Sequence, residues 1–346
     1  MIARASAVAL VVAALAGSAQ AGVIRYDVAD PTHLNFGADP RFASVGQIKG
    51  KTSTFSFNAA GRLIASNWVL TAAHVVDRAT SMDFKVGGGT YQASSWFTFP
   101  DWNGNLSAGY DMALIRFDVD LTAATGIALA RRFTRTDEIG RTGHAVGFGR
   151  TGTGLTGAVT SDQKKRAGSN KIDKLMVTPG ATDRILLSDF DRPGMSSESS
   201  MGSSTPISRE FLIAAGDSGG GLFVNFDGAF GLAGVHSFGY GAKDGTFNAG
   251  CGDASGHSRV SMFNAWIDAV IAQGGPVASA ASLLGRSSGL TGLTAIAVPE
   301  PGAWSILVLG LLAVALQNHL RRLSTQSSIG ISTRITRHRT SSAHGA

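Results

Sequence analysis

Three short segments carry residue types that could together perform nucleophilic catalysis. Residues 70–75, Leu-Thr-Ala-Ala-His-Val, end an apolar run with His74, and Asp111 opens a second apolar run. Residues 216–221, Gly-Asp-Ser-Gly-Gly-Gly, place Ser218 among glycines. A serine hydroxyl needs a base to take its proton, a histidine can be that base, and a third group can orient the histidine. The three segments therefore indicate hydrolysis through a serine nucleophile, provided that the fold brings them together.

The glycines around Ser218 meet a second requirement of this chemistry. The tetrahedral oxyanion needs donors aimed at it, and glycines let the backbone turn so that the N–H groups of Gly216 and Ser218 converge on one point. Each feature alone has an ordinary explanation: a packed histidine, an aspartate at a strand start, a glycine-rich loop. Only their combination points to catalysis.

The elements that must position these residues are mostly strands. Short aliphatic segments alternate with clusters of Gly, Asn, Asp or Ser, as expected for antiparallel strands joined by turns. They comprise residues 62–65, 68–71, 113–117, 145–148, 221–224 and 231–235. One helical period is convincing, from Ser261 to Gln273, and Gly274-Gly275-Pro276 should end it. The pattern predicts a β-rich body with one terminal helix.

Taken in order, Thr-Ala-Ala-His, Asp-Met-Ala-Leu and Gly-Asp-Ser-Gly-Gly resemble the motifs of the trypsin/chymotrypsin family of serine endopeptidases. The resemblance covers residues 42–273. It implies an all-β fold of two antiparallel six-stranded β-barrels (chymotrypsin-like) with a C-terminal helix and the site in the cleft between the barrels. It also implies catalysis of polypeptide hydrolysis by His74, Asp111 and Ser218, with an oxyanion hole at Gly216 and Ser218. Neither a cofactor nor a metal is expected.

The same resemblance suggests substrate-binding residues. Ser237 and Gly239 match a segment that pairs with the substrate backbone as an added strand. Enzymes that cleave after Lys or Arg carry an aspartate six residues before the serine, where this chain has Leu212, so that preference is not expected. In some bacterial relatives a histidine at the position of His236 helps to bind an acidic P1 side chain. Apolar and acidic P1 residues both stay open, and His236 can equally be an ordinary strand histidine.

Two further positions depart from the family pattern. In the family, the residue at the position of Asp217 binds an N-terminus that is freed by cleavage at an Ile-Val-Gly-Gly site. No such site occurs between residues 21 and 45, so the partner of Asp217 is not identified from the sequence. Cys251 is the single cysteine and cannot pair within the chain. Some relatives bridge a cysteine near it to one at the position of Ala214. We expect an unpaired structural residue, with a reactive thiol or an intermolecular bridge as alternatives.

Charge is concentrated at the two ends of the 346-residue chain. The formal net charge is +6, yet residues 22–297 contain 24 basic and 23 acidic residues, so no nucleic-acid partner is expected. Residues 1–21 carry Arg4, an apolar run and Ala19-Gln20-Ala21, which is typical of a secretory signal peptide cleaved after Ala21.

The C-terminal end resembles the PEP-CTERM sorting signal of Gram-negative bacteria. Val298-Pro299-Glu300-Pro301 precedes an apolar run, and Arg321-Arg322 follows it. The resemblance implies export, transient anchoring of this segment in the inner membrane, processing by an exosortase-type enzyme, and a final extracellular or cell-surface location. The chain departs from the pattern by continuing to residue 346.

These observations divide the chain into seven predicted parts: 1–21 signal peptide, 22–41 N-terminal segment, 42–125 first β-barrel, 126–273 second β-barrel plus terminal helix, 274–297 flexible linker, 298–322 sorting and transmembrane segment, and 323–346 disordered basic tail.

Two rival hypotheses for the function remain. Gly-x-Ser-x-Gly also occurs in α/β-hydrolases, whose order Ser, acid, His could be met by Asp227 or Asp244 with His257, but the chain after Ser218 is strand-like. The other is a catalytically inactive, protease-like surface or matrix-binding protein.

Overall fold

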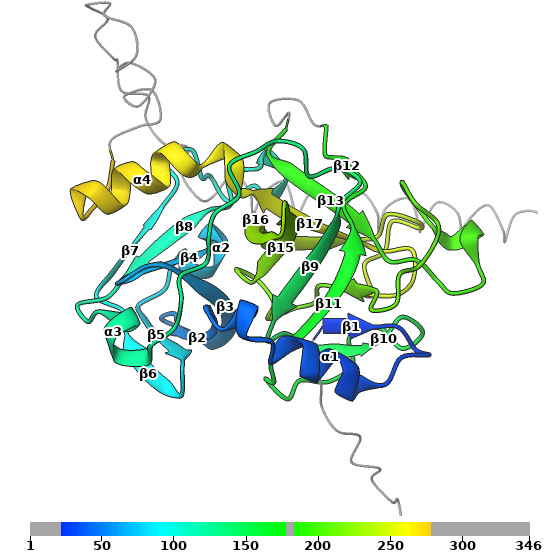
Figure 1. The fold of residues 1–346 in the computed structure, drawn as a ribbon, viewed down its shortest axis with the longest axis horizontal. Coiled ribbons are helices and arrows are strands. Elements are labelled where there is room, and N and C mark those ends of the chain that lie inside the picture. Colours follow the sequence, from blue (N-terminus) through cyan, green and yellow to red (C-terminus); the bar gives the residue numbers. More distant parts are fainter. Residues whose placement is uncertain (1–21, 178–182, 278–346) are drawn as a thin grey trace, which may run out of the picture. The chain divides into compact units, whose positions relative to one another are not determined.

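The computed structural model describes residues 22–177 and 183–277, which form two curled antiparallel sheets of seven strands each (Figure 1). The predicted all-β fold with a C-terminal helix is confirmed. Each sheet has seven strands rather than the expected six, and in the second sheet the two-residue β12 forms one edge. The predicted signal peptide, sorting segment and tail, and most of the predicted linker, lie outside the described residues.

The first sheet has the strand order β6-β5-β2-β3-β4-β8-β7. Alternation of apolar and polar residues sets its inner face: in β5, Met82, Phe84 and Val86 are buried and the residues between them are more exposed. The strands are β2 (Val45–Lys51), β3 (Ser56–Ala65), β4 (Trp68–Thr71), β5 (Ser81–Val86), β6 (Gly89–Gln92), β7 (Ser95–Thr98) and β8 (Ala113–Arg116).

The second sheet has the order β11-β9-β15-β16-β17-β13-β12. Its core contains Phe133, Leu186, Leu222 and Val224. The strands are β9 (Thr142–Gly147), β11 (Arg166–Lys171), β12 (Lys174–Leu175), β13 (Ile185–Asp189), β15 (Gly221–Phe226), β16 (Ala229–Tyr240) and β17 (Ala254–Arg259).

A third, small sheet ties the start of the described chain to the second half of the molecule. β1 (Gly22–Ile24) lies between β10 (Thr151–Thr153), to which it is parallel, and β14 (Phe211–Leu212), to which it is antiparallel. Helix α1 (Asp30–Gly37) then packs beside β11, where Asp30 pairs with the fully buried Arg166. Much of the predicted N-terminal segment 22–41 is thus integrated with the second sheet.

The C-terminal helix packs back on the first sheet. The helices are α2 (Ala73–Val76), α3 (Leu121–Thr125) and α4 (Asn264–Gln273), with 3-10 turns at Pro40–Phe42, Leu106–Ala108, Ser196–Glu198 and Val260–Met262. The ring of Trp266 lies 5.4 Å from that of Phe99, between centroids. Burying such a side chain stabilises the fold by about 1.5–3 kcal/mol. Gly274 ends the helix in the left-handed conformation (φ 67°), as its sequence predicts.

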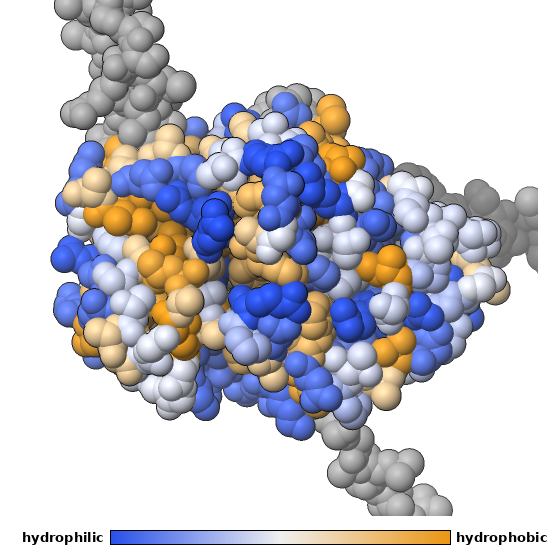
Figure 2. All heavy atoms as spheres, viewed as in Figure 1, coloured by the Kyte–Doolittle hydropathy of each residue, from blue (hydrophilic) through white to orange (hydrophobic). Residues whose placement is uncertain are grey.

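The surface seen in Figure 2 shows several separate apolar patches set among polar side chains. Within residues 22–177 and 183–277, no helix has both the length and the apolar character needed to span a membrane.

Candidate active site

The pairing of β4 with β8 brings His74 and Asp111 together. Thr71, the last residue of β4, lies opposite Ala113, the first residue of β8. Because the strands are antiparallel, the chain leaving β4 toward His74 passes the chain that enters β8 from Asp111. Residues 37 positions apart in the chain therefore meet at one end of the first sheet.

Asp111 is fully buried and holds His74 through both carboxylate oxygens. Its Oδ1 accepts the backbone N–H of His74 at 2.8 Å, and its Oδ2 lies 2.7 Å from His74 Nδ1. With Asp111 ionised, this contact places a proton on Nδ1 and leaves Nε2 as an acceptor. The side chain of His74 is 28% exposed, so Nε2 can reach a substrate.

Two residues of the second sheet also form hydrogen bonds with Asp111. Ser237 of β16 donates its hydroxyl to Asp111 Oδ2 at 2.5 Å, and Ser258 of β17 donates to the backbone carbonyl of Asp111 at 2.9 Å. These hydrogen bonds cross from one sheet to the other. Ser237 thus fixes the carboxylate that orients His74, and Ser258 fixes the backbone of Asp111. Sequence reasoning missed Ser258, whose short Ser-Arg-Val context gives no motif.

Ser218 sits on a tight turn that enters β15. Gly216 and Gly219 flank it with φ values of 96° and 77°, which favour glycine. The turn is held on both sides: the Gly219 N–H donates to the His236 carbonyl, and the Ser218 carbonyl accepts the N–H of Ala60 from β3, both at 2.8 Å. Ser218 itself is partly exposed.

The N–H groups of Gly216 and Ser218 make no recorded hydrogen bond to the described part of the chain. The carbonyl of Ala215 accepts the N–H of Arg150 at 2.7 Å. Because a trans peptide points its carbonyl and its N–H in opposite directions, this bond turns the Gly216 N–H away from Arg150. Neither predicted oxyanion donor is therefore engaged in a hydrogen bond within the described residues.

Ser218 and His74 line the same cavity, of about 190 Å³, together with Phe55, Phe57 and Ala59. No hydrogen bond between the Ser218 and His74 side chains is recorded among the described residues. Catalytic hydrogen bonds are often long before a substrate binds. The fold thus brings all three residues of the predicted triad to one site, His74 and Asp111 from the first sheet and Ser218 from the second.

The predicted substrate-binding residues divide into two groups. Ser237 and Gly239 lie on β16 beyond Val235, where pairing with β15 stops while pairing with β17 continues. Within the described residues, one edge of this segment therefore has no partner strand. A Cβ atom on Gly239 would lie 2.1 Å from Cζ of Phe247, so the exposed Phe247 ring packs on this glycine.

Leu212 and His236 are both fully buried. Leu212 pairs with Val23 in the small sheet and packs against Phe190. His236 Nδ1 lies 3.0 Å from Nδ1 of His257. Burial lowers the pKa of His257 to about 3 and that of His236 well below its ordinary value, the latter also through the neighbouring His257 and Arg62. Both rings are therefore neutral at neutral pH.

Asp217, next to the serine, is fully buried and has no ion-pair partner among the described residues. Its carboxylate accepts the backbone N–H groups of Gly149 at 2.7 Å and Ala214 at 2.9 Å. Burial raises its pKa to about 7, against the effect of these donors. β1 lies close by, because Gly22 pairs with Thr151, two residues after Gly149, and Val23 pairs with Leu212, two residues before Ala214.

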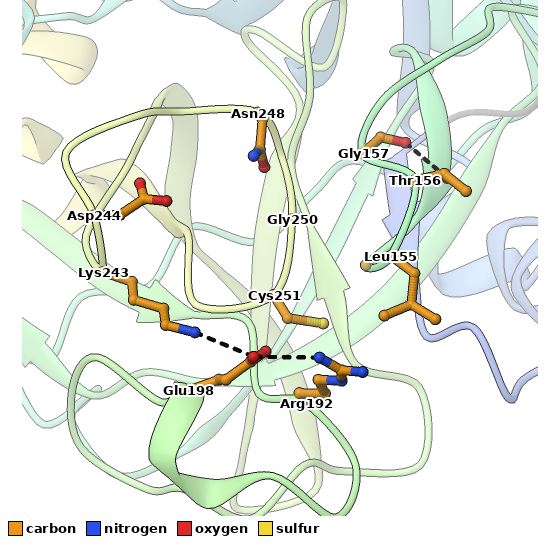
Figure 3. Close-up of a pocket in the computed structure, with 11 residues that line it drawn as sticks. Leu155, Thr156, Gly157, Arg192, Glu198, Lys243, Asp244, Asn248, Gly250 and Cys251 are labelled. Atoms are coloured by element: carbon orange, nitrogen blue, oxygen red, sulfur yellow. Dashed lines mark hydrogen bonds and ion pairs between the residues drawn. The ribbon is translucent and has the colours of Figure 1, made fainter.

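A second cavity, of about 330 Å³, contains none of the predicted triad residues (Figure 3). Glu198 bridges Arg192 and Lys243 in it, and Cys251 lines it. Cys251 is unpaired, and burial raises its pKa to about 11, so the thiol stays protonated at neutral pH. This favours the structural interpretation of Cys251 over a reactive thiol. No cluster of potential metal ligands occurs within the described ranges.

The chain resembles several known proteins, and one family model matches it. A solved structure titled HL collagenase aligns with a TM-score of 0.48 at 19% identity, over 68% of this chain and 95% of its own. Chymotrypsin-like elastase family member 1 of Canis lupus familiaris is 30% identical over 236 residues, covering 61% of this chain and 80% of its own length. The protein of the same name in Felis catus is 28% identical over 238 residues, covering 61% and 78%. Residues 38–267 match the family model described as Trypsin. The chain therefore belongs to the trypsin family of serine proteases.

Proposed function

We propose that this protein is a serine endopeptidase in which Ser218, His74 and Asp111 form the catalytic triad. The observation that carries the proposal is the buried Asp111 bound to both the backbone and the ring of His74, beside a cavity that Ser218 shares. Ser218 alone on a glycine-rich turn would be far weaker support.

The proposed reaction follows the established serine-protease scheme. Ser218 Oγ attacks the carbonyl carbon of the scissile bond while His74 Nε2 takes the hydroxyl proton. The N–H groups of Gly216 and Ser218 stabilise the oxyanion. His74 then gives its proton to the leaving amine, an ester to Ser218 remains, and water activated by His74 hydrolyses it. Asp111 keeps His74 in the required tautomer and stabilises its charged form.

Labelling with a fluorophosphonate tests this function directly. We expect one equivalent of probe on Ser218 of the wild-type protein, because the probe reacts with an activated serine. His74→Ala should label far more slowly, since no base remains. Absence of labelling in correctly processed wild-type protein would instead favour the inactive surface or matrix-binding protein.

For the P1 side chain, we propose an apolar preference. Leu212 takes the place of the aspartate that holds Lys or Arg, and it is packed among apolar side chains. Because their pKa values are lowered, neither His236 nor His257 carries a positive charge that could pair with an acidic P1 side chain at neutral pH. Both features disfavour a charged P1 residue.

A peptide library cleaved at pH 7 measures this preference. We expect kcat/KM for an apolar P1 residue to exceed that for Lys, Arg, Asp or Glu by at least about 100-fold, because burying an unpaired charge costs several kcal/mol. A preference for Lys or Arg would contradict the role given to Leu212, and a preference for Glu would contradict the neutral histidine pair.

We further propose that the protein is exported by residues 1–21 and sorted by residues 298–322 to the surface of a Gram-negative bacterium. The arrangement of charge and apolar residues in both segments supports this. An exosortase-type enzyme would process the second segment. Intact mass of the mature protein tests both steps: we expect an N-terminus at Gly22 and loss of the residues beyond the sorting signal. A protein with both ends uncut would contradict it.

Maturation and activity are connected in this proposal. Cleavage after Ala21 would free the α-amino group of Gly22, in the strand that lies beside the segments holding Asp217. We propose that this amino group is the missing cation for the Asp217 carboxylate. Export would then yield the active enzyme without a separate activation cleavage.

A further inference from the structure

Arg62 of β3 is fully buried and has no carboxylate partner among the described residues. The other deeply buried arginines differ: Arg166 pairs with Asp30 and Asp162, and Arg259 pairs with Glu138. Taking a guanidinium out of water costs several kcal/mol unless strong partners replace the solvent. Burial accordingly lowers the pKa of Arg62 to about 9. Other contacts must therefore offset the cost of burying the Arg62 guanidinium.

The recorded partners of Arg62 are backbone carbonyls of the turn that carries Ser218. Its Nη1 donates to the carbonyl of Gly219 at 3.0 Å and to that of Gly220 at 2.6 Å. Hydrogen bonds from a charged donor are roughly twice as strong as neutral ones. Nε and Nη2 have no recorded partner within the described residues, so the hydrogen bonding of this buried group is directed at the turn.

β3 holds three consecutive carbonyls on this turn. The backbone N–H of Ala60 binds the carbonyl of Ser218, and Arg62, two residues along the same strand, binds the next two. The contact is close: a Cβ atom on Gly219 would lie 2.1 Å from Oγ1 of Thr71, three residues before His74. The turn of the second sheet is therefore pressed against the strands of the first sheet that lead to His74.

Hydrogen bonds also run from the second sheet to a predicted catalytic residue of the first half. Asp111 of the first half is held by Ser237 and Ser258 of the second sheet. The first sheet thus binds the turn that carries Ser218, and the second sheet binds Asp111. Because a misplacement of about 1 Å can lower a rate about 100-fold, bonds that set the position of the serine relative to its base act on catalysis itself.

We propose that Arg62 is a positioning residue that holds the Ser218 turn against the first sheet and so sets Ser218 in register with His74. This rests on the proposed serine-protease function. Arg62 touches no substrate, and it acts through the carbonyls of Gly219 and Gly220.

Kinetics per active site separate positioning from mere stability. Arg62→Met keeps the length and apolar stem but removes the charge and donors, and Arg62→Lys restores a charge with one compact donor group. Arg259→Met is the matched control, since it removes a buried arginine that pairs with Glu138 instead of the serine turn. For each protein, fluorophosphonate titration counts competent sites, and a small ester substrate gives kcat and KM.

We expect Arg62→Met to lower kcat per titrated site by about 10- to 100-fold and to slow fluorophosphonate labelling similarly, with KM changed by less than about threefold. Arg62→Lys should recover part of the loss. Arg259→Met should lower the melting temperature but leave kcat per site unchanged.

The inference is overturned if Arg62→Met lowers only the melting temperature or the number of sites while kcat per site stays within about twofold of wild type. Should Arg62→Met fail to fold, Arg62→Gln, which keeps an amide donor without the charge, is judged by the same criterion. Wild-type protein that never labels would refute the proposed function instead, so the two failures are distinguishable.

Discussion

Replacing Ser218 with alanine is expected to lower kcat by about 10⁴-fold or more, the scale found when the nucleophile of a serine-hydrolase triad is removed. The alanine cannot form the ester intermediate, although Gly216 and residue 218 would still offer their N–H groups. KM should change little, because the proposed substrate contacts along Ser237 and Gly239 are not altered. Steady-state hydrolysis of a peptide amide, with active sites counted in the wild type, measures the loss.

A serine outside the site provides the control for this experiment. Ser94 donates its hydroxyl to the carbonyl of Arg116 on the surface of the first sheet. Ser94→Ala should keep wild-type kcat. If Ser218→Ala kept kcat within about tenfold, Ser218 would not be the nucleophile and the triad mechanism would be wrong.

The sequence predicted the candidate triad because its chemistry needs particular residue types. A histidine after a strand, an aspartate before one and a serine among glycines are each visible locally. Their meeting depends on the register of Thr71 opposite Ala113, which no local pattern reveals. The bonds from Ser237 and Ser258 to Asp111 likewise appear only in three dimensions.

Features built from distant contacts escaped prediction for a physical reason. Arg62 sits in the aliphatic strand Arg62-Leu63-Ile64-Ala65, where a single arginine would ordinarily extend toward solvent. Its partners lie 157 and 158 positions away in the chain. The partner strands of β1 are similarly remote, at β10 and β14. The six strands expected for each barrel came from the family resemblance, and the second sheet has the two-residue β12 as an additional edge strand.

Activity should depend on a free amino group at Gly22. An ionised Asp217 buried without a cation is costly, and its raised pKa of about 7 reflects this. Gly149 and Ala214 bind the carboxylate, and Arg150 binds the carbonyl that orients the Gly216 N–H. A cation that fixes Asp217 would therefore also fix the oxyanion donors. Gly22 suits this place, because a Cβ there would lie 1.8 Å from Cζ of Phe211.

Three preparations that differ only at the N-terminus test this dependence: one beginning at Gly22, one beginning at Ala21, and one beginning at Val23. We expect the first to be active and the other two to label with fluorophosphonate at least about 100-fold more slowly, since breaking a buried ion pair costs about 3–5 kcal/mol. The Asp217→Asn variant that begins at Gly22 should label as slowly as the proteins that begin at Ala21 or Val23. A matched surface change, Asp101→Asn, should not alter the labelling rate.

The pH dependence gives an independent signature of the same pair. The amino group of an unfolded chain has a pKa of about 7.7–8.0. Pairing with an ionised Asp217 raises that pKa in the folded enzyme, so the amino group's contribution to stability is fully present below about pH 7.7 and is lost as pH rises through the raised value. Activity of the Gly22 form should therefore fall on the alkaline side, and acetylation of the Gly22 amine should abolish activity at every pH. Equal activity of the Gly22 and Ala21 forms, or an acetylated enzyme that remains active, would show that another group orders the Ser218 turn.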